Sequence, residues 1–104
     1  MSLQKNEILD YLRNIKPDYK KSGIEKLALF GSFAREQNSE NSDVDVAIQL
    51  KSDYLKTHDV WEYFTLLENI KKDITKKFNK KIDIFDLDSS SEIKEHVLSE
   101  VLYV

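Results

Sequence analysis

The residues with the clearest chemical potential are a glycine–serine pair and three aspartates that follow it. Gly31 and Ser32 come directly after an apolar run, and ten residues (33–42) separate them from Asp43, with Asp45 two positions on. Asp83 lies in a later apolar segment. A glycine lets backbone N–H groups come close to a phosphate, and carboxylate oxygens are ligands that Mg²⁺ prefers. The pattern indicates a site for a magnesium nucleoside triphosphate.

Asp43 and Asp45 alternate with apolar residues as in a strand that has one polar face. Their Cα atoms would lie about 7 Å apart, because a strand rises roughly 3.3 Å per residue. This spacing suits one shared Mg²⁺, or two ions bridged by one carboxylate. Two such ions lie roughly 3.5–4 Å apart in known sites and stabilise both the attacking and the leaving oxygen of a displacement.

Asp83 falls on the same strand face as Phe85 and Leu87, opposite Ile82 and Ile84. If its strand lies beside that of the other two aspartates, it completes a cluster of three carboxylates. It would then either take the proton of the acceptor hydroxyl or bind the ion that activates this hydroxyl. Three packed carboxylates repel one another, which favours a cation between them.

The phosphate groups would be held by Gly31, Ser32 and Arg35. Ser32 can add its hydroxyl as a donor, and Arg35, one turn further, has a guanidinium that matches pairs of phosphate oxygens. Each feature alone has an ordinary structural explanation: a turn, a solvated strand end, or an exposed arginine. Their combination at this spacing favours the phosphate and metal site.

The elements that must position these residues alternate between helix and strand, which predicts an α/β layer structure with a small mixed sheet packed against helices. Pro17 is expected to end the first helix, and a serine–glutamate capping box to begin the last one. Trp61 and Phe64 are expected in the core. The predicted segments are helix Ser2–Lys16, strand Ile24–Phe30, a short helix from Ser32, loop Gln37–Ser42, strand Asp43–Leu50, helix Thr57–Phe78, strand Lys81–Leu87, and a last helix after Ser89–Glu92.

Length and composition restrict the class of protein. The 104 residues suit a single domain, residues 1–104, and with no cysteine neither disulfides nor thiolate metal sites can form. A net charge of −3 argues against stable binding of nucleic acid through a general basic surface. No apolar run reaches the roughly 20 residues that span a bilayer, so a cytoplasmic protein without membrane association is expected. A lysine cluster forms either a solvated helix face or a docking surface for an acidic partner: Lys71, Lys72, Lys76, Lys77, Lys80 and Lys81.

The segment FGSFAREQNSENSDVDVAI resembles the signature of the DNA polymerase beta-type nucleotidyltransferase superfamily. The ending KIDIFDLDSSSEIKEHVLSEVLYV resembles the minimal nucleotidyltransferases, or MNT proteins, and the resemblance covers about Ile24–Val104. It implies the polymerase beta-like fold, with Gly31 and Ser32 on the triphosphate of ATP. It also implies two Mg²⁺ ions on Asp43 and Asp45.

By the same resemblance, Asp83 is the third acidic residue.

Proteins similar to this chain are commonly antitoxins paired with a helical HEPN ribonuclease toxin, and they transfer AMP from ATP to a tyrosine of that toxin. Many relatives have glycine where Glu36 stands, and we expect the helix simply to continue through Glu36. Acceptor contacts would come from the toxin or from a second copy of the chain, because no acceptor-binding domain follows Asp83.

Two other functions remain open at this level. The chain could be an antitoxin that neutralises its partner by binding and occlusion, without catalysis. It could also be a nucleotidyltransferase that acts on a small molecule or on the 3′ end of an RNA.

Overall fold

A four-stranded mixed sheet with the strand order β3-β2-β1-β4 organises the chain. The structure, a computed structural model, describes residues 3–104. Among these residues, no helix has the length and apolar composition needed to cross a membrane. The elements are α1 Lys5–Ser22, β1 Ile24–Phe30, α2 Gly31–Ala34, β2 Val44–Leu50, α3 Tyr54–Thr57, α4 Val60–Phe78, β3 Ile82–Asp86, α5 Lys94–Glu100 and β4 Leu102–Tyr103.

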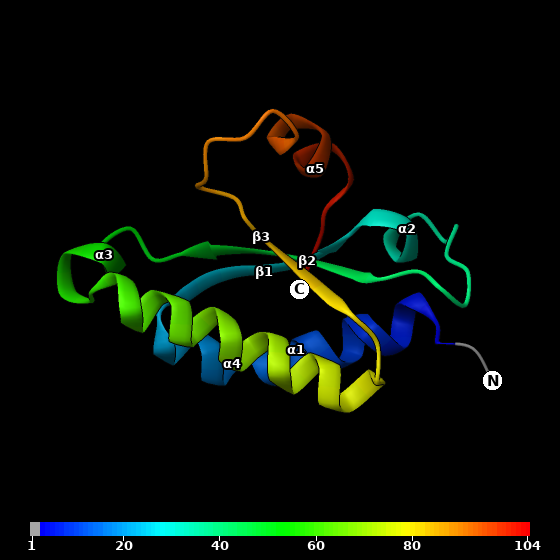
Figure 1. Cartoon of the computed structure of the whole chain (residues 1–104), viewed down its shortest axis with the longest axis horizontal. Coiled ribbons are helices and arrows are strands. Elements are labelled where there is room, and N and C mark those ends of the chain that lie inside the picture. The colour runs from blue at the N-terminus through cyan, green and yellow to red at the C-terminus, as the bar shows by residue number, and fades with distance from the viewer. Residues whose placement is uncertain (1–2) are drawn as a thin grey trace.

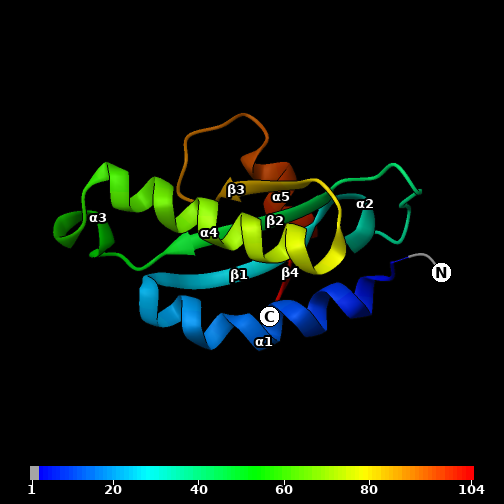
Figure 2. The ribbon, with the colours of Figure 1, turned by 60° about the horizontal axis from the view of Figure 1, so that its bottom comes forward.

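Both faces of the sheet are covered, but unequally. The helices α1 and α4 lie on one face, while α5 alone lies over the other (Figures 1 and 2). Strand β1 pairs antiparallel with β2 and β4, whereas β2 and β3 are parallel. A parallel pair needs a crossover connection, and α4 supplies it. The predicted mixed α/β sheet is confirmed.

The side-chain alternation of β2 divides the core in two. Val44, Val46 and Ile48 are fully buried in the large core formed with α1 and α4. Ala47, on the opposite face, packs in a small cluster under α5 with Val97 and two other residues. Since side chains alternate along a strand, the predicted polar face of β2 is the face under α5.

The expectation that Pro17 ends the first helix is wrong. Helix α1 continues through Pro17 to Ser22, and Gly23, with φ of 120°, ends it by donating its N–H to the carbonyl of Lys20. A proline inside a helix removes one backbone hydrogen bond. The additional turn buries Tyr19, whose hydroxyl donates to a carboxylate oxygen of Asp73, and these contacts offset that loss. The predicted start at Ser2 lies outside the described residues.

The helix predicted for Thr57–Phe78 is α4, which begins at Val60 and ends at Phe78 as predicted, and the separate short helix α3 before it was not predicted. Asp59 caps α4 and forms a capping box with Glu62. The prediction that Trp61 and Phe64 are core residues is wrong, because these side chains are 75% and 52% exposed. The first turns of α4 lie with α3 at one end of the molecule, past the strands, and the buried positions of this helix begin only at Leu66 (Figure 1).

The predicted capping box at Ser89–Glu92 does not form. Helix α5 begins only at Lys94, and Ser91 instead accepts a hydrogen bond from the Ile93 N–H. The short strand β4, which was not predicted, pairs with Ala28 and Leu29 of β1. Two residues are too few for a recognisable periodicity.

Glu36 does not continue a helix as predicted. Helix α2 begins at Gly31, one residue before the expected start, and ends at Ala34. Glu36 has φ of 59°, in the left-handed region that glycine adopts at lower cost. The Lys5 ammonium donates to the Glu36 carboxylate and ties this turn to α1. The glutamate therefore affects the turn after α2 rather than the length of the helix.

Candidate active site

The topology places Asp45 beside Asp83. Strands β2 and β3 are parallel neighbours, and their register pairs these two residues directly. In-register side chains of adjacent strands lie on the same face, and the strands are about 4.8 Å apart. Asp43 is half-buried and immediately precedes β2, while Asp83 is exposed to solvent. The condition under which Asp83 joins the other two aspartates, that its strand lies beside theirs, is therefore met.

Gly31 lies against Asp45. It follows Phe30, which is the β1 partner of Asp45, and it has φ of +79°. A Cβ atom at this position would lie 2.0 Å from Asp45 Oδ2, far inside van der Waals contact. Only glycine therefore fits the bend, and the backbone of α2 approaches the carboxylate for that reason. Ser32 is half-buried next to it.

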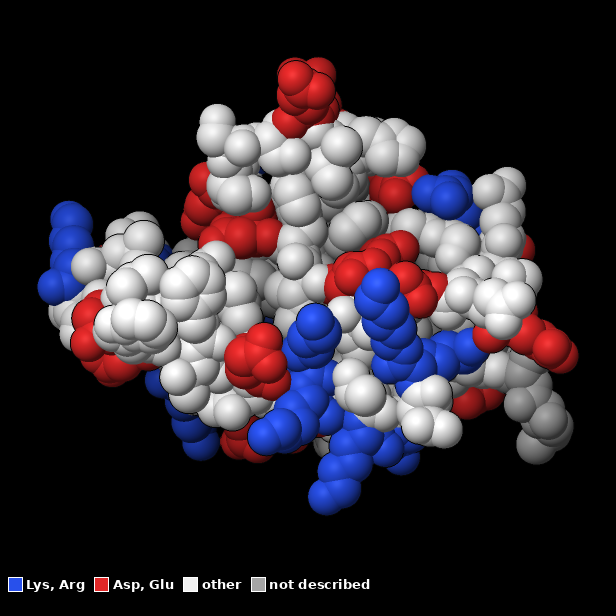
Figure 3. All heavy atoms as spheres, viewed as in Figure 1, with Lys and Arg blue, Asp and Glu red and all other residues white. Residues whose placement is uncertain are grey.

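Asp45 is the electrostatic centre of the site. Burial, together with the negative charges of Asp83, Asp43 and Glu100, raises the pKa of its carboxyl to about 6, and Arg35 opposes this effect. Figure 3 shows acidic surface between α5 and α2, next to basic surface over the C-terminal half of α4. The carboxylates thus repel one another, which a bound cation would relieve.

The three predicted ligands share one region but not one coordination shell. Within residues 3–104, no three acidic or histidine side chains converge closely enough to hold a metal ion. Asp45 and Asp83 are adjacent through strand register, and Asp43 is near enough to raise the pKa of Asp45. Carboxylates of like charge favour side-chain orientations that keep them apart. Whether these residues bind metal stays a prediction.

Glu100, at the end of α5, is a member of the site that the sequence interpretation missed. The Gly31 N–H donates to Glu100 Oε1 at 3.0 Å, and Arg35 Nη1 donates to Glu100 Oε2 at 2.7 Å. Burial by itself would raise the pKa of Glu100, but these donors outweigh it and hold that pKa below its ordinary value. The hydrogen bond to Gly31 joins residues 69 positions apart, which no local pattern predicts.

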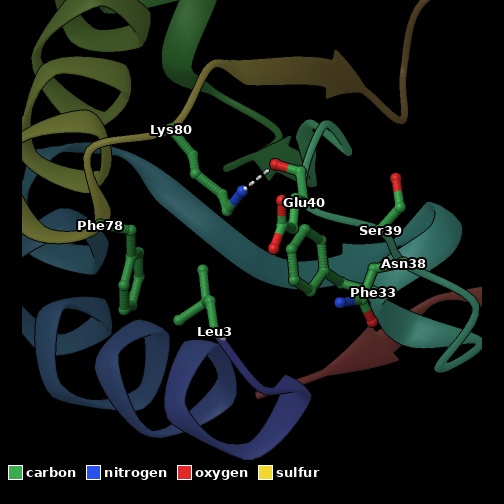
Figure 4. Close-up of a pocket in the computed structure, with 7 residues that line it drawn as sticks. All are labelled: Leu3, Phe33, Asn38, Ser39, Glu40, Phe78 and Lys80. Carbon is green, nitrogen blue, oxygen red and sulfur yellow. Dashed lines mark hydrogen bonds between the residues drawn. The ribbon is translucent and has the colours of Figure 1, made fainter. Parts of the chain in front are cut away.

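A separate hollow of about 570 Å³ lies beneath the loop that joins α2 to β2 (Figure 4). Lys80 donates to the carbonyl of Glu40 across its rim, at 2.8 Å. Leu3 and Phe78 line it from the side of α1 and α4, which is the sheet face opposite the aspartates. The hollow is therefore distinct from the acidic site.

Replacing Asp45 with asparagine should stabilise the metal-free protein above pH 6. Because the folded-state pKa is about 6 and the ordinary value is 3.8, the folded chain loses stability as pH rises between these values. The variant avoids this loss. After allowance for solvent screening we expect about 1 kcal/mol, or roughly 4–8 °C in Tm, at pH 8.

Thermal unfolding with a chelator at pH 4 and pH 8 checks this prediction. The difference from wild type should vanish near pH 4, where the folded wild-type carboxyl is protonated as well. Asp53→Asn, an exposed change of the same charge, serves as control and should show no such pH dependence. Equal Tm values for Asp45→Asn and wild type at pH 8 would contradict the charge crowding.

Known proteins are similar to this chain in sequence and in fold. A match to the family described as Polymerase beta, Nucleotidyltransferase spans residues 7–104. The protein adenylyltransferase MntA of Thermococcus cleftensis is 31% identical over 84 residues, which are 79% of this chain and 76% of that protein.

Two solved structures are similar in fold. A toxin–antitoxin crystal structure with AMP-PNP superposes with a TM-score of 0.61 at 24% identity, over 97% of this chain and 72% of its own. A complex of tri-AMPylated Shewanella oneidensis HEPN toxin with MNT antitoxin gives 0.52 at 21% identity, over 95% of this chain and 66% of its own.

Proposed function

The chain belongs to the polymerase beta nucleotidyltransferase family, and on this premise we propose that it transfers AMP from ATP to a hydroxyl group of a partner protein. The observation that carries the proposal is the in-register pair Asp45 and Asp83 beside the Gly31 bend. Two strand carboxylates next to a closely approaching backbone suit nucleotidyl transfer. The 31% identity to a protein adenylyltransferase supports a protein acceptor.

We infer that the partner is a HEPN toxin and the acceptor one of its tyrosines, so that the chain acts as an antitoxin. The support is the likeness in fold to proteins solved in toxin–antitoxin complexes, one of them with an AMPylated HEPN toxin. The phenolic oxygen of tyrosine is a suitable nucleophile once its proton has an acceptor.

The donor set of the site fits Mg²⁺. Asp43, Asp45 and Asp83 offer only carboxylate oxygens, and the crowding of negative charge at Asp45 favours a dication. These three residues would hold the metal, two ions being the predicted number. When bound, magnesium neutralises the charge of the triphosphate.

The residues of the chain would then position the reactants. The Gly31 N–H, the Ser32 hydroxyl and the Arg35 guanidinium donate to phosphate oxygens. The acceptor oxygen attacks the α-phosphorus, the bond from that phosphorus to the bridging oxygen breaks, and pyrophosphate leaves. Exposed Asp83 assists the loss of the acceptor's proton. Most of the catalysis is positioning and charge neutralisation, as in phosphoryl transfer generally.

Intact-mass spectrometry of the cognate HEPN toxin tests the proposal. Incubation with this protein, ATP and Mg²⁺ should raise the toxin mass by whole AMP units. A chelator should prevent the increase, as should an ATP analogue with a methylene group between the α- and β-phosphorus. An unmodified toxin in a stable complex would instead indicate neutralisation by occlusion. If label from radioactive ATP is transferred only to RNA or to small molecules, the acceptor is one of these and not a protein.

A further inference from the structure

Glu100 bonds simultaneously to two of the groups to which we assign phosphate binding. One carboxylate oxygen accepts from the Gly31 N–H at 3.0 Å, and the other accepts from Arg35 Nη1 at 2.7 Å. The Glu100 side chain is only 13% exposed, whereas Arg35 is 42% exposed. The carboxylate thus lies between the bend after β1 and the arginine, as a bridging anion.

A carboxylate and a phosphate group make the same demands on these donors. Each presents two oxygens that accept charge-assisted hydrogen bonds, and a guanidinium can pair with either. The Gly31 N–H has one hydrogen, which is already used by Glu100. A phosphate oxygen that takes this hydrogen must therefore displace Glu100. Repulsion between the two anions adds to the cost of leaving the carboxylate nearby.

We propose that Glu100 occupies the triphosphate site from within the chain, and that nucleotide binds only after this carboxylate has left Gly31 and Arg35. This proposal rests on the proposed function. Glu100 then sets the affinity for nucleotide without taking part in the transfer step. The measured affinity is the intrinsic one reduced by the fraction of molecules in which the carboxylate has moved away.

The position of Glu100 makes such a movement feasible. It is the last residue of α5, a helix of seven residues in which Val97 is the only buried position. His96, one turn earlier, approaches the same carboxylate, its Nε2 lying 3.6 Å from Oε2. The ring is 69% exposed, so it offers a partner near solvent to a carboxylate that swings out. A change of side-chain rotamer is enough to break both hydrogen bonds.

Glu100→Gln tests the proposal, because glutamine keeps the shape but loses the charge that holds the donors. The Kd for Mg-AMP-PNP, measured by calorimetry, should fall about tenfold. The KM for ATP in AMP transfer should fall similarly, while kcat stays unchanged. Glu95→Gln is the matched control, since it removes an equal charge from an exposed position of the same helix and should leave Kd unchanged.

Amide hydrogen exchange in the wild-type chain gives a measurement that needs no variant. Addition of Mg-AMP-PNP should speed exchange across α5, because the Glu100 contacts that hold the end of this helix are lost. Slower exchange in α5, or an unchanged Kd for Glu100→Gln, would overturn the proposal and leave Glu100 as a structural tie. A fall in kcat for this variant would also overturn it, because Glu100 would then serve the transfer step.

The outcomes separate this proposal from the proposed function. If neither wild type nor Glu100→Gln binds Mg-AMP-PNP, both the proposed nucleotidyltransferase function and the proposed role of Glu100 are wrong. If both bind equally, only the role of Glu100 fails. Binding by the variant with little binding by wild type would support both.

Discussion

Asp43→Ala should lower the rate of AMP transfer about 100- to 1,000-fold. The aspartate removed is one of three proposed metal ligands, and loss of a group that stabilises transition-state charge typically costs 10²–10³-fold. The measurement is the initial rate of mass increase on the toxin, at saturating ATP and Mg²⁺. The fold should remain intact, because Asp43 lies outside β2 and its side chain is only half-buried.

Asp88→Ala is the matched control for this loss. Asp88 is exposed just after β3, near Asp83 in sequence, and accepts a hydrogen bond from Gln49. It removes the same charge from a residue that does not contribute to the charge crowding at Asp45, so transfer should proceed at the wild-type rate. Transfer that survives Asp43→Ala would remove this residue from the site. If Asp43→Ala still neutralised the toxin fully in cells, occlusion would be the mechanism of neutralisation.

Gly31→Ala should produce the largest loss of stability, roughly 2–4 kcal/mol. The added methyl group would meet Asp45 Oδ2 at 2.0 Å, and alanine would have to adopt φ of +79°. Overpacking and a left-handed backbone each cost about 1–3 kcal/mol. Thermal unfolding should show a Tm lower by roughly 10 °C or more.

A double-mutant cycle separates the two causes. In an Asp45→Ala background the carboxyl group that obstructs the new methyl group is gone, and what remains is the backbone strain and a milder contact of 3.0 Å with the Cβ atom of residue 45. Gly31→Ala should therefore cost clearly less stability there than in the wild-type chain. An equal cost in both backgrounds would show that the close approach of Gly31 to Asp45 is not the cause.

The strands of the site were predictable because their alternation is strong. The apolar residues of β2 and β3 recur every second position, so the polar face of each strand follows from the sequence, while the pairing of Asp45 with Asp83 comes from the strand register of the structure. The glycine bend follows in the same way from Gly31 after an apolar strand. Each of these features is local, or combines two local patterns.

The errors arose where tertiary packing overrides local preference. Pro17 predicts a helix end, but the buried Tyr19 beyond it makes the additional turn favourable. Trp61 has a large apolar side chain of the kind usually found in a core. It is exposed because the sheet does not extend beneath the start of α4 (Figure 1). Glu100 looks like any polar residue near a helix end. Only the folded chain shows that it meets Gly31 and Arg35.

The short strand β4 gives the last residues an influence on the candidate active site. It pairs with Ala28 and Leu29 directly after α5, Val104 N–H donates to the Leu27 carbonyl, and the Lys16 ammonium donates to the carbonyl of Val104. Because Glu100 stands two residues before β4, the strand acts as an anchor for the carboxylate. If Glu100 controls nucleotide affinity as proposed, a change that disturbs β4 should alter this affinity although the residues proposed to contact the nucleotide stay intact.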